Sequence, residues 1–252
     1  MESKVIIQTK DLTKYYGRQA AVDHLTFTVN AGEIFGFLGP NGAGKTTTLL
    51  MLLGLTEPSA GSADVMGINP TRDAIGVKRH IGYLQENMGF YRDLDAFQTL
   101  KFITDLNDLP DDVATERIHS AIKTVGLENA GQKLISAYSR GMRQRLGIAE
   151  VLVKSPKIAF LDEPTLGLDP DTTNRIIDLI QWLSHEKKMT ILLSSHLLYQ
   201  VQRICDRVGI MINGKMVACG EMDRLAAEKL GVGKEQYSLE SLYMKYFQEG
   251  DA

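Results

Sequence analysis

A glycine-rich segment that ends in a lysine and two threonines has the residue types needed to bind a phosphate. It lies between a strand-like run at 34–38 and an apolar helical pattern, and its sequence is Gly39-Pro40-Asn41-Gly42-Ala43-Gly44-Lys45-Thr46-Thr47. Glycines let successive backbone N–H groups face one anion, the helix start adds the positive end of its dipole, and Lys45 adds a charge. The Thr46 hydroxyl can ligate Mg²⁺. A glycine-rich turn could match by chance, but the flanking strand and helix favour a nucleoside triphosphate site.

Two acidic residues close a second strand-like run. Asp162 and Glu163 follow the continuous apolar stretch at 158–161. In parallel-sheet nucleotide folds the ligand lies at the carboxyl ends of the strands, so Asp162 is placed to reach Mg²⁺ and Glu163 to polarise the attacking water. Such a pair can also serve only as a helix cap. Beside a phosphate-binding segment, we interpret it as part of the catalytic site.

The elements that must position these residues have an α/β pattern. Short β-type runs at 4–8, 25–29 and 34–38 are separated by turn residues, which predicts an antiparallel start. A helix at 46–53 follows, closed by Gly54. Runs at 158–161, 190–194 and 207–212 are continuously apolar, as in strands covered on both faces. Asn213-Gly214 predicts a hairpin to a last strand at 215–218.

Between residues 86 and 152 the strand signals vanish. Phe97, Leu100, Ile103 and Leu106 recur at helical spacing, and a second stripe follows the helix-start sequence 110–112. We interpret this stretch as a helical insertion, with Phe102 in its core. An amphipathic helix is predicted at 239–247.

Composition and charge limit the function classes. The chain has 252 residues with 28 basic and 31 acidic side chains, a net charge of −3, which argues against a general nucleic-acid or anionic-membrane binder. Cys205 and Cys219 have no partners at zinc-ligand spacing, so two reduced thiols are expected. The N-terminus lacks a signal-peptide pattern, and the longest apolar run, 49–55, is far shorter than the roughly 20 residues of a spanning helix. We therefore expect a cytoplasmic protein.

Taken together and in this order, the motifs resemble those of the ATP-binding subunit of ABC transporters, nearly from end to end. The resemblance implies that Tyr16 stacks on adenine. It also implies that Gln85, in IGYLQEN, reaches Mg²⁺ and the lytic water and senses a membrane partner, and that His196, in LLSSH, contacts the γ-phosphate. Taken singly, these residues are better explained as a strand-end aromatic, a surface amide and a capping or core histidine. Their order and spacing outweigh those interpretations.

The same resemblance assigns the segment 138–142, YSRGM, to the signature motif. The commonest form is LSGGQ, so Ser139 and Gly141 are retained while the final glutamine is replaced by Met142. Ser139 and Gly141 are expected to bind the phosphates of a partner chain, and Asp169 lies in the loop after the second acidic motif. The variant signature and the closing YSLESLYMKYF are similar to prokaryotic ABC-2 export subunits.

The resemblance implies an α/β P-loop NTPase core with an N-terminal antiparallel β-subdomain and an inserted all-helical signature subdomain. We expect the core at 1–85 and 153–220, the signature subdomain at 86–152 and a C-terminal helical extension at 221–252. The expected ligands are ATP and Mg²⁺. The expected partners are a second ATP-binding subunit, identical or related, and an integral permease. The protein would then be peripheral on the cytoplasmic face of the membrane, would bind no nucleic acid and would drive export.

The permease would dock in a groove beside Gln85 that Met88, Phe90 and Tyr91 line, unless these three are only subdomain core. Two other functions are weighed against a transporter motor. Soluble ABC-type ATPases of DNA maintenance or translation usually bring heptad arms, tandem cassettes or basic patches, and the sequence has none of these features. A GTPase or metabolite kinase would leave the signature and His196 unexplained, and no NKxD guanine motif is present.

Overall fold

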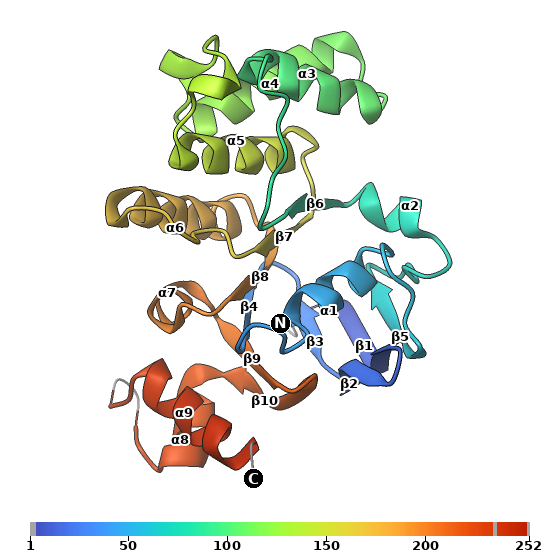
Figure 1. Ribbon diagram of the computed structural model, residues 1–252, viewed down its shortest axis with the longest axis vertical. Coiled ribbons are helices and arrows are strands. Elements are labelled where there is room, and N and C mark those ends of the chain that lie inside the picture. Colours follow the sequence, from blue (N-terminus) through green and yellow to red (C-terminus); the bar gives the residue numbers. More distant parts are fainter. Residues whose placement is uncertain (1–3, 234–235, 251–252) are drawn as a thin grey trace.

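The fold is built on a six-stranded sheet in the order β10-β9-β4-β8-β7-β6 (Figure 1). These strands are β4 Ile34–Leu38, β6 Ile81–Leu84, β7 Ile158–Asp162, β8 Thr190–Ser195, β9 Arg207–Ile212 and β10 Lys215–Glu221. All neighbours are parallel except β10, which pairs antiparallel with β9 through the predicted turn. Asn213 and Gly214 in that turn both have positive φ, as a type I′ hairpin requires. This computed structural model describes residues 4–233 and 236–250, so parts of the ranges predicted at 1–85 and 221–252, namely residues 1–3, 234–235 and 251–252, lie outside the described residues.

A smaller antiparallel sheet lies beside the first. Its strands are β1 Val5–Tyr16, β2 Gln19–Leu25, β3 Thr28–Asn30 and β5 Ala60–Val65, and β1 pairs with the other three. The antiparallel start is confirmed for the first two predicted runs, although the run at 25–29 spans the end of β2 and the start of β3. It is wrong for the run at 34–38, which is β4 and pairs parallel with β8 and β9 in the larger sheet. Strand β5 was not predicted because its residues are small or polar and mostly exposed, so it carries no alternating pattern.

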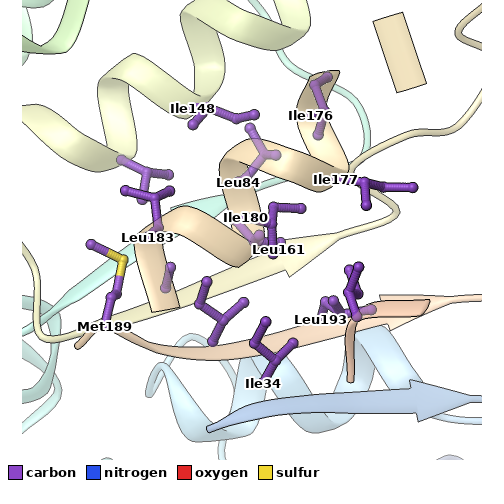
Figure 2. Packing of buried hydrophobic residues seen from close by; sticks show 14 of the residues in the cluster. Ile34, Leu84, Ile148, Leu161, Ile176, Ile177, Ile180, Leu183, Met189 and Leu193 are labelled. Carbon is purple, nitrogen blue, oxygen red and sulfur yellow. The ribbon is translucent and has the colours of Figure 1, made fainter. Parts of the chain in front are cut away.

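The strand β4 shows how both faces of the larger sheet are covered. Phe35 and Phe37 point into one apolar cluster with Phe27, Phe160 and residues of α1 Lys45–Leu52. Ile34 points into the other cluster, where α6 Pro170–His185 packs with Ile176, Ile177, Ile180 and Leu183 (Figure 2). The continuous apolar run therefore does indicate a strand buried on both sides.

All described elements between β6 and β7 are helical. They are α3 Ala96–Leu106, α4 Asp111–Thr124, α5 Arg140–Val153 and two short 3₁₀ turns at Glu128–Ala130 and Ile135–Ala137. In Figure 1 these helices form one end of the molecule. Phe102 was predicted in their core, and this is wrong because its side chain is 43% exposed. Its ring packs edge to face with that of Tyr91, and the two ring centroids are 5.9 Å apart. Met88 and Phe90 are partly buried against the core, whereas Tyr91 is 62% exposed.

The remaining helices are α2 Ala74–Lys78, α7 Leu198–Ile204, α8 Met222–Leu230 and α9 Leu239–Gly250. The predicted C-terminal amphipathic helix is confirmed as α9, which buries Leu239 and Leu242. The Leu239 N–H donates a 2.8 Å hydrogen bond to Gln202 Oε1 on α7, so α9 is fixed to the core. The helices α8 and α9 lie at the end of the molecule opposite α3 and α4 (Figure 1). Within the described residues, none of these helices has the length and hydropathy to cross a membrane.

Candidate functional site

A cleft of about 520 Å³ lies at the carboxyl edge of the parallel strands. The sheet register brings Leu38 beside Ser195 and Asp162 beside Ser194, so the loops after β4, β7 and β8 meet at one place. The residues that line the cleft come from these loops, the loop after β6 and the antiparallel sheet. They are Tyr16, Gln19, Ala21, Asn41, Gly42, Gly44, Lys45, Thr46, Thr47, Glu86, Asp162, Glu163, Leu166 and His196.

The phosphate-binding segment predicted from the sequence curls between β4 and α1. At two of its positions only glycine fits, because a side chain would clash with the neighbouring backbone. Gly39 and Gly44 have φ values of 155° and 100°, which side chains rarely adopt. A Cβ at Gly39 would lie 2.3 Å from the Met211 carbonyl oxygen, and one at Gly44 would lie 2.4 Å from the Ala21 carbonyl oxygen. Close backbone approach therefore fixes the loop that exposes the N-terminus of α1.

Lys45 lies at the first turn of α1, only 6% exposed. Its ammonium donates to the carbonyl oxygens of Gly39 at 2.7 Å and Pro40 at 3.1 Å. Burial lowers the pKa of Lys45, and nearby carboxylates oppose this effect, Glu163 most strongly and then Asp162 and Glu86. The lysine is thus a cation held inside a cleft that carries three carboxylates.

Asp162 is 2% exposed and is held by two hydroxyl groups. Thr46 Oγ1 donates to Asp162 Oδ2 at 2.9 Å, and the Ser194 hydroxyl donates to Asp162 Oδ1. The first bond joins the phosphate-binding segment to the end of β7. Two of the three residues predicted to hold Mg²⁺, Thr46 and Asp162, are therefore in direct contact.

Glu163 and His196 form a pair at the floor of the cleft. His196 Nδ1 lies 2.9 Å from Glu163 Oε1, and the Glu163 side chain is 7% exposed against 38% for His196. The Glu163 backbone has a φ of 48°, an uncommon conformation for a side-chain-bearing residue, and its N–H donates to the Ser194 carbonyl at 3.1 Å. The strained turn directs the Glu163 carboxylate toward the phosphate-binding segment and His196.

Tyr16 lines the cleft with 54% of its surface exposed, and the Lys14 ammonium lies 5.2 Å from its ring centroid. Gln85 is exposed and is absent from the cleft lining, whereas the next residue, Glu86, lines it. Sequence reasoning missed Glu86 and also Ser194. The signal for Ser194 was available, because a parallel strand that ends beside Asp162 must bring a neighbour to that carboxylate.

Besides Gln85, three predicted residues outside the phosphate-binding segment do not line this cleft, and these three, Ser139, Gly141 and Asp169, lie together elsewhere. Ser139 is the N-cap of α5, where its hydroxyl accepts the Met142 N–H at 3.2 Å. Asp169 caps α6 by accepting the Thr172 N–H at 2.9 Å, and these hydrogen bonds lower its pKa. A Cβ on Gly141 would lie 2.8 Å from Thr172 Cγ2, so the two helix starts are neighbours.

A phosphate-binding loop, a buried aspartate and a glutamate–histidine pair at the carboxyl edge of a parallel sheet define a P-loop ATPase. The family model described as ABC transporter matches residues 22–166. The chain therefore belongs to the ABC transporter family, as an ATP-binding and ATP-hydrolysing subunit. This also confirms the α/β fold with an antiparallel sheet and a P-loop core that the sequence predicted.

Relatives and solved structures agree with this assignment. The chain is 42% identical over 212 residues to the bacitracin transport ATP-binding protein BcrA of Bacillus licheniformis, covering 84% of this chain and 68% of that protein. It is 34% identical over 215 residues to the linearmycin resistance ATP-binding protein LnrL of Bacillus subtilis, covering 85% and 69%. A solved ATP-binding subunit of an ABC transporter superimposes with a TM-score of 0.86 at 28% identity, covering 96% and 99%. The cbiO1 subunit from Clostridium perfringens, part of the complex cbiONQ, gives 0.81 at 29%, covering 90% and 92%.

Proposed function

We propose that this chain is the motor of an ABC-2-type exporter: two copies, or this chain and a related one, close around two Mg-ATP and drive a separate permease. The observation that carries the proposal is the convergence of Lys45, Asp162, Glu163 and His196 in one cleft. The transport names of BcrA and LnrL support the export direction. The protein would work at the cytoplasmic face of the membrane, which it would contact only through the permease.

The residues present fit a bound Mg²⁺. This ion prefers oxygen ligands and usually takes one or two from the protein, with phosphate oxygens and waters completing the octahedron. The Thr46 hydroxyl and the Asp162 carboxylate already lie 2.9 Å apart, and the described residues hold no cluster of three or more His, Cys, Asp or Glu that would form an all-protein cage. Bound there, Mg²⁺ would supply charge neutralisation between the β- and γ-phosphates. Gln85 is also proposed as a ligand, which requires the loop after β6 to turn its side chain into the cleft. In this structure the neighbouring residue Glu86 lines the cleft in its place.

Each group in the cleft has a distinct role in hydrolysis. Backbone N–H groups of the segment from Gly39 to Thr47 and the N-terminus of α1 bind the phosphates, and Lys45 supplies the positive charge. Glu163 accepts a proton from the attacking water, because its carboxylate is buried and oriented. His196 holds that carboxylate through Nδ1 and presents the rest of its half-exposed ring to the γ-phosphate.

The remaining predicted residues serve binding and assembly. Tyr16 stacks on the adenine with a face that tolerates any base. Ser139 and Gly141 at the start of α5 bind the phosphates of the partner chain, and Asp169 holds the start of α6 beside them. We keep the division into a core at 1–85 and 153–220, a signature subdomain at 86–152 and an extension at 221–252.

The permease is proposed to dock beside the loop after β6. Tyr91 and Phe102 are both exposed there and contact each other, so they form an exposed aromatic surface. Met88 and Phe90 are partly buried and pack against the core. Binding of ATP would close the two subunits, and hydrolysis would release them. The motion would pass to the permease through this surface.

A soluble ABC-type ATPase is the second function considered. It would use the same cleft and the same dimer. The relatives with transport names favour the transporter, and no basic surface is indicated by the net charge of −3. Purification of the chain with its native membrane and identification of a co-purifying integral protein would decide between the two functions.

The test of the cleft uses two variants that fail in different ways. Lys45→Ala removes phosphate-binding charge, so ATP affinity and turnover should both fall. Glu163→Gln keeps the shape but accepts no proton, so turnover should fall by about 10²–10⁴-fold while Mg-ATP binds and locks a dimer. Glu228→Gln, which changes an exposed carboxylate on α8, is the control and should match the parent. Size-exclusion chromatography with Mg-ATP gives the dimer fraction, and a monomeric Glu163→Gln protein with parental turnover would contradict the assignment.

A further inference from the structure

A hydrogen bond between Thr165 and Gln200 joins the two loops that carry Glu163 and His196. The Thr165 hydroxyl, on a residue that is 4% exposed, donates to Gln200 Oε1. Thr165 lies two residues after Glu163, and Gln200 lies four residues after His196, in the first turn of α7. The loops are therefore joined at two points, once by the Glu163–His196 pair and once by Thr165–Gln200.

The helix α7 depends on contacts outside itself. It has seven residues, Leu197 at its N-cap provides no side-chain cap, and helices this short are unstable alone. Its second half is held by Arg203, which donates to Asn174 and Asp178 on α6 at 2.7 Å. Within the described part of the chain, Gln200 makes the one side-chain hydrogen bond from the first turn. That bond therefore adds to the 3.0 Å bond from the Leu197 N–H to the Ser195 hydroxyl and to the core packing of Leu198 and Val201 in holding the end of α7 nearest His196.

The other loop is held at three successive residues. The Glu163 N–H donates to the Ser194 carbonyl on β8, and Gln144 Nε2 on α5 donates to the Pro164 carbonyl at 2.7 Å. The Thr165 hydroxyl bonded to α7 is the third contact. Because Glu163 has a positive φ, its backbone is strained and stays in place only when its surroundings determine it.

We propose that Gln200 is a positioning residue for ATP hydrolysis: by accepting the Thr165 hydroxyl, it holds His196 in register with the Glu163 carboxylate. The inference rests on the proposed function of that carboxylate. Neither Thr165 nor Gln200 lines the cleft, so neither contacts ATP. The bond therefore affects the chemical step and leaves nucleotide binding unchanged.

The substitution Thr165→Val tests the bond without changing side-chain shape, because valine replaces the hydroxyl by a methyl group. Loss of one hydrogen bond that orients a reacting group should slow single-turnover ATP hydrolysis about fivefold to tenfold, with the ATP dissociation constant within about twofold of the parent. Gln200→Leu should give the same loss. Thr165→Ser keeps the hydroxyl and should recover most of the parental rate.

Gln202→Leu is the matched control on α7. Gln202 Oε1 accepts the Leu239 N–H of α9, so this variant breaks a bond of the same kind that does not reach the catalytic loop. It should hydrolyse ATP at the parental rate, even if its melting temperature falls as far as that of Gln200→Leu. An equal loss of rate in Gln202→Leu would show that α7 needs only general support, and would overturn the proposal.

A double-mutant cycle separates positioning from an independent effect. In a His196→Ala background the histidine is no longer there to be oriented, so Thr165→Val should lower the rate no further. A further loss of the same size, or a parental rate in the single Thr165→Val protein, would refute the positioning role alone. A parental rate in Glu163→Gln, measured in the same assay, is the separate result that would contradict the proposed function.

Discussion

Ser194→Ala is expected to destabilise the protein more than an ordinary buried serine substitution does. Ser194 is fully buried, and its hydroxyl donates to the carboxylate of Asp162, which is 2% exposed. A hydrogen bond to a charged group contributes about twice as much as one between neutral groups. Alanine would leave the buried carboxylate with the Thr46 hydroxyl alone.

The magnitude follows from the chemistry of the two partners. Loss of a hydrogen bond to a buried charge should lower the free energy of unfolding by about 2 kcal/mol. The comparison is Ser184→Ala, because Ser184 is 1% exposed and donates at 3.0 Å to the neutral carbonyl of Gly32. That variant should lose about 1 kcal/mol. The Glu163 N–H loses its longer bond to the Ser194 hydroxyl, at 3.3 Å, but keeps its 3.1 Å bond to the Ser194 backbone carbonyl, so it is not left without an acceptor.

Urea unfolding without nucleotide, followed by circular dichroism, measures both variants against the parent. For a chain of this length each kcal/mol corresponds to a melting shift of about 2–4 °C, so Ser194→Ala should melt about 4–8 °C lower. If Ser194→Ala is no less stable than Ser184→Ala, then Asp162 does not depend on a charge-assisted hydrogen bond. That result would refute the conclusion that β8 holds the Asp162 carboxylate through Ser194.

Three further outcomes are expected. Tyr16→Ala should weaken ATP affinity with little change in the bound-state rate, whereas Tyr15→Ala, at an exposed neighbour outside the cleft, should leave ATP affinity unchanged. Equal effects of the two substitutions in nucleotide titrations would contradict adenine stacking on Tyr16. Glu86→Gln should tighten the binding of ATP without Mg²⁺ by about fivefold, because it removes one of the three carboxylates that surround Lys45 in the cleft. An ATP affinity equal to that of the parent, measured in EDTA, would contradict this expectation. A dimer of one Lys45→Ala chain and one Ser139→Arg chain should trap ATP at its single intact site, and no gain over either variant alone would exclude a site shared between chains.

The phosphate-binding segment could be predicted because its chemistry is local in the sequence. Lys45 and Thr46 follow their glycines directly in the sequence, so the motif is easily recognised. The same two residues begin α1, so its N-terminus lies at the end of the motif. Asp162 and Glu163 were visible for a similar reason, since they end a strand whose apolar run is continuous. The two groups of residues come together because the strands that precede them are parallel strands of one sheet and end at the same edge.

The loop after β6 could not be resolved from the sequence. Gln85 and Glu86 are adjacent and polar, and the strand before them, Ile81–Leu84, is short and contains Gly82, so no periodicity predicts where it ends. A difference of one residue decides which side chain lines the cleft. The exposure of Phe102 was missed for a related reason. Phe102 lies in a helix with many apolar residues, which suggested a buried position, and its contact with Tyr91 could not be predicted because Tyr91 comes from a loop without a regular pattern.

The position of the signature segment supports the proposal that each nucleotide site is shared between two chains. Ser139 is exposed at the start of the fourteen-residue helix α5, where the positive end of the dipole attracts an anion. The two residues that follow it pack against the start of α6 and the segment that leads into it: the Arg140 guanidinium lies beside Gly167, and Gly141 lies beside Thr172. Neither Ser139 nor these residues line the cleft that holds Lys45. We therefore propose that the phosphate bound at Lys45 meets the α5 N-terminus of a second chain, and this is why the two inactive variants should complement each other.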